Sequence, residues 1–266
     1  MANLEPLIQS IPVAPLKLAS LEGCRTLADQ VNNYLVSFRH ESPTNVGQAD
    51  SLQGYCADSY LLECECPRFG SGEGKGVLKE SVRGCDLFIM VDVTNYSLTY
   101  RVNGYENHMS PDNHYQDLKR IISAADGKAR RINVIMPFLY EGRQHKRSKR
   151  ESLDCALMLQ ELVDMGVSNI LTFDAHDPRV SNSILHGFDS FMPTYQFLKA
   201  LVNSVPDFVI DNDHLMIISP DEGAMGRAVY FSNILGVDMG MFYKRRDYST
   251  VVNGKNPIVA HEFLGD

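Results

Sequence analysis

The sequence lacks several features that would place it in special classes of protein. No apolar stretch approaches the roughly 20 residues of a membrane span, so we expect no transmembrane segment and no membrane partner. The N-terminus, MANLEPLIQSIPVAPLKL, lacks the basic start and apolar core of a signal peptide. Positive charge is in deficit, because 25 Lys and Arg stand against 33 Asp and Glu. This balance argues against a general nucleic-acid-binding protein.

The six cysteines form no zinc-ribbon or thioredoxin pattern. Only Cys64 and Cys66 lie close together, and a single residue separates them. That spacing matches neither kind of site. We therefore expect all six to be reduced thiols in a cytoplasmic protein.

The pattern of apolar residues indicates an α/β fold. The chain has 266 residues, of which 44% are hydrophobic and 22% charged, as in ordinary globular proteins. Short apolar runs alternate with amphipathic stretches, which is typical of a mostly parallel sheet. We expect strands at 16–19, 60–66, 86–93, 131–138, 168–173, 215–219, 237–243 and 257–264. Helices are expected at 21–36, 113–126, 152–165 (with Ser152 as N-cap), 194–205 and 222–235. The pattern restarts after Pro193, which predicts two domains, 1–190 and 191–266.

A dense cluster of positive charge follows the predicted strand at 131–138. Between Arg143 and Arg150 the chain carries five Lys or Arg residues and one His. Ligands of open α/β sheets bind beyond the carboxyl ends of the strands, and Arg binds phosphate oxygens through paired hydrogen bonds. The cluster therefore indicates a polyphosphate site. A charged loop in solvent and a patch for RNA are the alternatives.

Carboxylates follow two other predicted strands. The segment Thr172–Asp177 holds two Asp and one His, and Asp221 lies in Ser-Pro-Asp-Glu-Gly after the strand at 215–219. Such groups hold Mg²⁺ or orient a phosphate, or they serve only as caps. Three cations, Lys244–Arg246, end a further strand. Acidic and basic sites on one edge together indicate Mg-nucleotide phosphoryl chemistry.

These motifs, in this order and at these spacings, resemble the ribose-phosphate pyrophosphokinases, or phosphoribosyl pyrophosphate (PRPP) synthetases. The similarity runs, with insertions, from Leu16 to Asp266. It is carried by Arg68-Phe69, Ser81–Asp86, Val134–Arg150, Thr172–Asp177, Ser219–Ala228 and Lys244–Arg246. The resemblance implies tandem type I phosphoribosyltransferase-like domains with mainly parallel sheets, the second incomplete in this chain. It also implies transfer of the β,γ-diphosphoryl group of Mg-ATP to ribose 5-phosphate, which yields PRPP and AMP.

The resemblance further implies an ATP site that two subunits share. Arg143 and Gln144 match family residues that contact ATP at the head of the basic loop. Phe69 and Glu73 match residues that hold adenine from a neighbouring subunit, so a homo-oligomer is expected. Ser71 lies where the family usually has an Asn that contacts the nucleotide.

Four residues match the catalytic and metal positions of the family. His176 matches the histidine beside Mg²⁺, and Asp221 matches the aspartate associated with the metal. Lys244 and Arg246 match the pair that stabilises the transferring diphosphoryl group. The attacking hydroxyl belongs to the substrate, so no Ser-His-Asp constellation is needed.

The chain also departs from the family pattern. Segments Ser42–Gly54 and Thr94–Pro111 are extra or longer than usual. The Asp-Asp pair and Thr/Gly-rich loop that bind the 5-phosphate of ribose 5-phosphate are not found in the sequence. We therefore expect either part of a longer protein or a shortened paralogue.

Three hypotheses on function follow. The first is a divergent PRPP synthetase, an enzyme, which His176, Lys244 and Arg246 favour. The second is a catalytically inactive regulatory or structural subunit of a PRPP synthetase assembly, which the missing ribose-phosphate loop favours. The third is an RNA-binding protein, which is disfavoured because no aromatic platform accompanies the basic residues.

Overall fold

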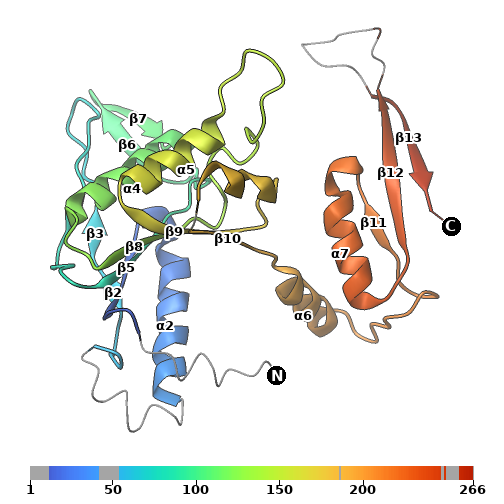
Figure 1. The fold of residues 1–266 in the computed structure, drawn as a ribbon, viewed down its shortest axis with the longest axis horizontal. Helices are drawn as coiled ribbons and strands as arrows, with labels where there is room; N and C mark the ends of the chain where they lie inside the picture. The colour runs from blue at the N-terminus through green and yellow to red at the C-terminus, as the bar shows by residue number, and fades with distance from the viewer. Residues whose placement is uncertain (1–11, 42–53, 186, 247–248, 250–257, 266) are drawn as a thin grey trace. The chain divides into compact units, whose positions relative to one another are not determined.

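The protein consists of two compact units, Met1–Met192 and Pro193–Asp266 (Figure 1). The computed structural model describes residues 12–41, 54–185, 187–246, 249 and 258–265, with side chains in β12 and β13 described only outside 244–246 and 258–261. The segment predicted as an insertion at Ser42–Gly54 lies, apart from Gly54, outside the described residues.

The first unit is built on a six-stranded sheet with the order β10-β9-β8-β5-β1-β2, in which every pairing is parallel. One row of paired residues, Ala19, Ile89, Val134 and Ile170, crosses four strands and is fully buried. Parallel strands are covered on both faces, which explains their continuous apolar sequences. The strands are β1 (Leu16–Ser20), β2 (Leu61–Leu62), β5 (Asp86–Met90), β8 (Arg131–Ile135), β9 (Val167–Phe173) and β10 (Phe188–Phe191).

Helices cover both faces of this sheet. On one face, α4 (Pro111–Ala125) and α5 (Asp154–Asp164) contribute buried residues such as Leu118 and Leu159 to the main core. The other face holds a smaller cluster that includes Leu18 and Ala28, under η1 (Glu22–Cys24) and α2 (Arg25–Glu41). A short 3-10 segment, η3 (Pro178–Ser183), follows β9. The predicted α/β layering is confirmed for this unit.

Helix starts follow local chemistry, with two corrections to the predictions. Helix α4 begins two residues before the predicted start, because the Ser110 side chain accepts a hydrogen bond from the Asn113 backbone N–H, and Pro111 suits the first turn. Ser152 was predicted to be the N-cap of α5 but does not occupy that position. Its hydroxyl donates instead to the Asp154 carboxylate at 2.5 Å, and Leu153 occupies the cap position without a side-chain bond.

Two small antiparallel pairs complete the first unit. The predicted strand at 60–66 is divided, because only Leu61–Leu62 joins the main sheet while β3 (Cys64–Glu65) pairs with β4 (Val77–Leu78). The long segment Thr94–Pro111 contains a hairpin, β6 (Thr99–Val102) and β7 (Tyr105–His108). Its turn is Asn103-Gly104, with positive φ at both residues, as two-residue hairpin turns favour.

The second unit carries a three-stranded sheet with the order β11-β12-β13. Strands β11 and β12 are parallel, whereas β12 and β13 are antiparallel. Predicted strands and helices are found here within a few residues of their expected ends. They are α6 (Thr194–Ser204), β11 (Ile217–Ser219), η4 (Glu222–Ala224), α7 (Met225–Leu235), β12 (Met239–Arg246) and β13 (Ile258–Leu264).

The cysteines and the helix lengths complete the description of the fold. All six cysteines are free thiols, as predicted. Within the described ranges, every helix is too short or too polar to cross a bilayer.

Candidate functional site

The loops after β8 and β9 meet at the carboxyl edge of the first sheet. The two strands are parallel neighbours, so the segments that follow them leave the same edge. The rings of His145, from the basic loop, and His176 lie 5.0 Å apart between centroids. The His145 Nε2 atom is 3.6 Å from Oδ2 of Asp177. The structure thus brings together two motifs that the sequence predicts at one site.

Gln144 joins the head of the basic loop to the segment that follows the loop. Its side-chain amide donates to the Ser152 carbonyl at 2.7 Å, and its own carbonyl accepts from the Cys155 N–H at 3.4 Å. Glu141 supplies the turn before it, with positive φ and a carbonyl that accepts the Gln144 N–H at 2.8 Å. The residue predicted to contact ATP therefore also joins the two ends of the loop.

The cations of the basic loop are presented to solvent. Arg143 is exposed, as are Lys146, Arg147, Lys149 and Arg150. The Arg143 carbonyl contacts Nδ1 of His145 at 3.2 Å, which fixes the backbone at the head of the loop. Exposed cations beside a strand end attract anions, although a solvated loop has the same appearance.

The Asp177 carboxylate is bound by Arg179. Its carboxylate accepts hydrogen bonds from the Arg179 backbone N–H at 3.0 Å and from Nε at 2.9 Å, and it begins η3. These hydrogen bonds hold the pKa of the Asp177 carboxyl well below its usual range. The carboxylate is therefore ionised but engaged. His176 itself is exposed, and Asp174 has a left-handed backbone with φ of 43°.

In the second unit, Asp221 is the N-cap of η4. Its Oδ1 accepts the Ala224 N–H at 3.1 Å, and its carbonyl accepts the hydroxyl of fully buried Ser219 at 2.7 Å. A cap was one of the two roles predicted for this residue. The backbones of Lys244 and Arg246 lie in β12, opposite His261 and Ile258, with a register irregularity before Arg246.

The predicted adenine contacts lie on a tight turn between β3 and β4. The Phe69 N–H donates to the Glu73 carbonyl at 2.7 Å, and the Ser71 hydroxyl donates to the Glu73 carboxylate at 2.8 Å. Phe69 is 55% exposed. Strands β2 and β9 are separated in the sheet by three strands, so this turn and His176 belong to different ends of the strand order.

Sequence reasoning missed a buried ionic cluster beneath this turn. Arg68 donates to both oxygens of Asp117, at 2.6 and 2.8 Å, and Arg120 donates to the same carboxylate at 2.6 Å. Arg68 and Asp117 lie 49 residues apart, so no local pattern indicates the pair. His145 was counted only as part of the basic cluster. The Asp177-Pro178 step, an N-cap followed by Pro, was the one local signal for η3.

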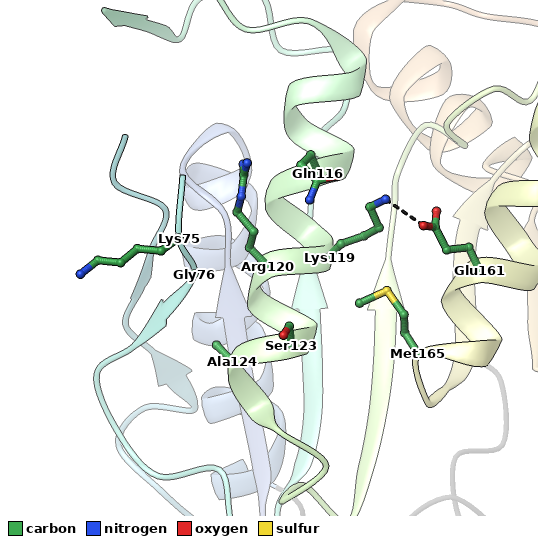
Figure 2. A pocket seen from close by; sticks show the side chains of 9 residues that line it. All are labelled: Lys75, Gly76, Gln116, Lys119, Arg120, Ser123, Ala124, Glu161 and Met165. Atoms are coloured by element: carbon green, nitrogen blue, oxygen red, sulfur yellow. Dashed lines mark hydrogen bonds and ion pairs between the residues drawn. The ribbon is translucent and has the colours of Figure 1, made fainter. Parts of the chain in front are cut away.

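A cavity of about 510 Å³ lies over the outer face of α4 but contains none of the predicted site residues. Figure 2 shows Lys119 reaching to Glu161, with Nζ 2.8 Å from Oε1, while the Lys75 side chain extends away from the helix. The cationic side chains of this cavity do not converge on a common centre. The cavity is therefore not part of the candidate site.

Known proteins resemble this chain in sequence and in fold. Residues 16–166 match the family described as the N-terminal domain of ribose phosphate pyrophosphokinase. Ribose-phosphate pyrophosphokinases of Staphylococcus epidermidis and Staphylococcus aureus are 27% and 26% identical to it over 198 residues. Each alignment covers 74% of this chain and 56% of the relative, so the chain spans about half the length of these curated relatives.

The fold is that of a solved family member. The crystal structure of phosphoribosylpyrophosphate synthetase from Mycobacterium smegmatis matches with a TM-score of 0.67 and 21% identity, over 94% of this chain and 67% of that one. This likeness confirms the predicted α/β class and phosphoribosyltransferase-like architecture. Since the sequence match extends over more than half of the chain, the protein belongs to the ribose-phosphate pyrophosphokinase family.

Proposed function

We propose that the protein acts as a ribose-phosphate diphosphokinase in nucleotide biosynthesis. It would transfer the β,γ-diphosphoryl group of Mg-ATP to the 1-hydroxyl of ribose 5-phosphate, giving PRPP and AMP. The observation that carries this proposal is the contact between the basic loop and the segment after β9, through His145, His176 and Asp177. Family membership supports the reaction class.

The charges of the basic loop suit a polyphosphate. Arg143 and Gln144, at its head, would hold the phosphates of ATP. Diphosphoryl transfer places negative charge on oxygens that preorganised cations stabilise in the transition state. Lys244 and Arg246 of β12 would stabilise the group in transfer. Because the attacking oxygen belongs to ribose 5-phosphate, no covalent enzyme intermediate is required.

The donor set suits a Mg²⁺ that arrives with ATP. Among the described residues no three His, Cys, Asp or Glu side chains are grouped as a metal cage. Mg²⁺ commonly keeps several waters and is held by one or two protein groups plus substrate phosphates. His176 and Asp221 would be the protein groups associated with it. When bound, Mg²⁺ neutralises charge on the transferring phosphates.

Phe69, Ser71 and Glu73 would contact the adenine of an ATP bound to a neighbouring subunit. The exposure of the Phe69 ring and its place at the far end of the strand order support a contact outside its own subunit. A homo-oligomer with shared ATP sites is therefore part of the proposal. The six free thiols favour a cytoplasmic location.

AMP release from Mg-ATP and ribose 5-phosphate tests the assignment, with Lys244→Ala as the variant. We expect a loss of about 10²–10³-fold in kcat, as for removal of one transition-state donor, with the fold intact by circular dichroism. Lys199→Ala, an exposed lysine of α6 in the same unit, is the matched control and should retain full activity. If the protein binds Mg-ATP but releases no AMP, the regulatory-subunit hypothesis replaces the enzyme.

A further inference from the structure

A second cavity lies at the β1–β2 end of the carboxyl edge, and we call it the hairpin pocket. It has a volume of about 480 Å³, within the range of small-molecule sites. Its walls are the turn Leu21–Arg25, the segment Cys64–Arg68 and one strand of the β6–β7 hairpin, and residues Met109, His114 and Asp117 complete it. None of the residues proposed above for the transfer reaction lines it.

The hairpin is fixed as the roof of this pocket. The Asn103 N–H donates to the Gly70 carbonyl at 3.1 Å, and the Met109 N–H donates to the Leu98 carbonyl at 2.9 Å. Gly72, with φ of 91°, lies so close to Val102 that a Cβ would be 2.9 Å from its Cγ2. The segment Thr94–Pro111, which the proposed function leaves unexplained, thus builds one wall of a cavity.

The buried ionic cluster leaves excess positive charge beside the pocket. The carboxylate of Asp117, with 6% of its side chain exposed, is shared by the guanidinium groups of Arg68 and Arg120. One negative charge against two positive charges leaves one cation uncompensated. A buried excess charge is unfavourable unless a counter-ion approaches, so the cluster favours an anion nearby.

The rest of the lining contributes two further arginines. Arg25 and Arg101 are exposed on opposite walls, whereas the Glu65 carboxylate is paired with Lys79 at 2.5 Å. Glu22 is the third carboxylate of the lining, and Glu106 lies opposite Arg101 in the hairpin, outside the lining. Burial raises the pKa of the lining thiols Cys64 and Cys66 to about 11 and about 12, so neither adds negative charge at neutral pH. The three arginines of the lining equal its three carboxylates in number, but Glu65 is engaged by Lys79, and Asp117 by Arg68 and Arg120, so the charges of Arg25 and Arg101 face the cavity with only Glu22 among the lining carboxylates outside these pairs.

The pocket also has an apolar side and a fixed polar floor. Leu21 and Met109 are buried in its wall, with Leu98 half-buried beside them. His114, 2% exposed, is held by the contact of its Nε2 with the Asn95 carbonyl at 2.6 Å. Apolar walls with a few placed polar groups are typical of sites for small organic ligands.

We propose that the hairpin pocket binds a small organic anion, with a phosphate or carboxylate head between Arg25 and Arg101 and an apolar ring against Leu21, Leu98 and Met109. This site is additional to the proposed ATP site. Strands β1 and β9 are three strand spacings apart, about 14 Å. An occupant would also contact Arg68, next to the turn that carries Phe69.

Phenyl phosphate is a suitable probe of the pocket because it has both an anionic head and an apolar ring. Its binding is measured by isothermal titration calorimetry. We expect phenyl phosphate to bind at least tenfold more tightly than inorganic phosphate, which lacks the ring, or benzyl alcohol, which lacks the anion. Phenylacetate in a parallel titration distinguishes a carboxylate-selective site from a phosphate-selective one. Either preference supports the proposal. Equal affinity for phenyl phosphate and inorganic phosphate would overturn it.

Two variants locate the binding. Arg101→Ala, on the exposed hairpin, should weaken the binding of phenyl phosphate at least tenfold. Arg130 is exposed and lies outside the pocket lining, so Arg130→Ala should leave the affinity unchanged. Binding that survives Arg101→Ala but is lost in Arg147→Ala would place the probe on the basic loop and contradict the inference. Because no turnover is measured, failure here leaves the proposed enzyme activity untouched.

Discussion

The imidazole of His145 lies 3.6 Å from the carboxylate of Asp177 and 5.0 Å from the ring of His176. This contact joins the loop after β8 to the loop after β9. Arg179 also holds the Asp177 carboxylate, which is therefore a fixed point for the basic loop. In the proposed enzyme, this contact positions Arg143 for the phosphates of ATP.

We predict that His145→Ala weakens Mg-ATP binding by up to about tenfold, the effect of one lost polar contact. The expected cause is a less restrained basic loop, so the change should lie in the Kd for Mg-ATP, measured by calorimetry. His108→Ala, which removes an exposed histidine stacked on Tyr96, is the control and should not alter this Kd. An identical Kd for both variants would show that His145 does not position the loop.

Asp117→Asn should destabilise the first unit by about 3–5 kcal/mol, because it leaves Arg68 and Arg120 without their buried counter-charge. Urea unfolding at pH 7 measures the loss. Asp126→Asn breaks an ion pair whose carboxylate is 78% exposed, and such surface pairs contribute at most about 1 kcal/mol. Equal losses for the two variants would contradict a structural role for the Asp117 cluster.

Gly76→Ala should also destabilise the fold, because a Cβ there would lie 2.4 Å from the Arg120 carbonyl oxygen in α4. Backbone cannot move aside as a flexible side chain does, and strain of this kind costs about 1–3 kcal/mol. Gly70→Ala is the matched control, since nothing lies within 4 Å of its Cβ position. Thermal unfolding of the two variants should differ by several degrees. Equal melting temperatures would mean that the backbone at Gly76, just before β4, leaves room for a methyl group beside α4.

Alkaline pH should weaken the fold through its buried thiols. Burial raises the pKa of Cys24, Cys64 and Cys155 to about 11, whereas unfolded thiols titrate near pH 8.5. Between these values the unfolded state loses protons first, so stability is full below about pH 8.5 and falls as pH rises. The slope is about 1.4 kcal/mol per pH unit for each thiol.

Urea unfolding at pH 8 and pH 10 measures this loss, and single cysteine variants assign it. Cys24→Ala should reduce the dependence on pH, whereas Cys56→Ala should not, because Cys56 is exposed. Ellman's reagent should accordingly react with one thiol quickly in the native protein. Rapid reaction of several thiols at pH 8 would contradict the burial described here.

The sequence predicted the elements whose apolar pattern is strong and local. Runs such as 86–93 and 131–138 became the central strands β5 and β8, because parallel strands buried on both faces are continuously apolar. The β6–β7 hairpin was missed although Asn103-Gly104 is a direct turn signal, since its strands have four residues each and bury no apolar side chain. Strand β10, with Phe188 and Phe191 separated by polar residues, was missed for the same reason.

The candidate site was predictable only where its residues are close in sequence. The basic loop and the segment Thr172–Asp177 were visible as charge patterns after strands, and the parallel sheet brought them together. The engagement of Asp177 by Arg179, and of Asp117 by two arginines, depends on side-chain geometry that no spacing encodes. The hairpin pocket depends on tertiary contacts such as Asn103 to Gly70.

The phosphorus-containing products show which group the protein transfers. Phosphorus NMR of the protein incubated with Mg-ATP and ribose 5-phosphate separates transfer of a diphosphoryl group from transfer of a single phosphoryl group. We predict AMP and PRPP in equal amounts, with both reduced by Lys244→Ala and unaffected by Lys199→Ala. Formation of ADP in place of AMP, or no consumption of ATP above the rate without ribose 5-phosphate, would contradict it.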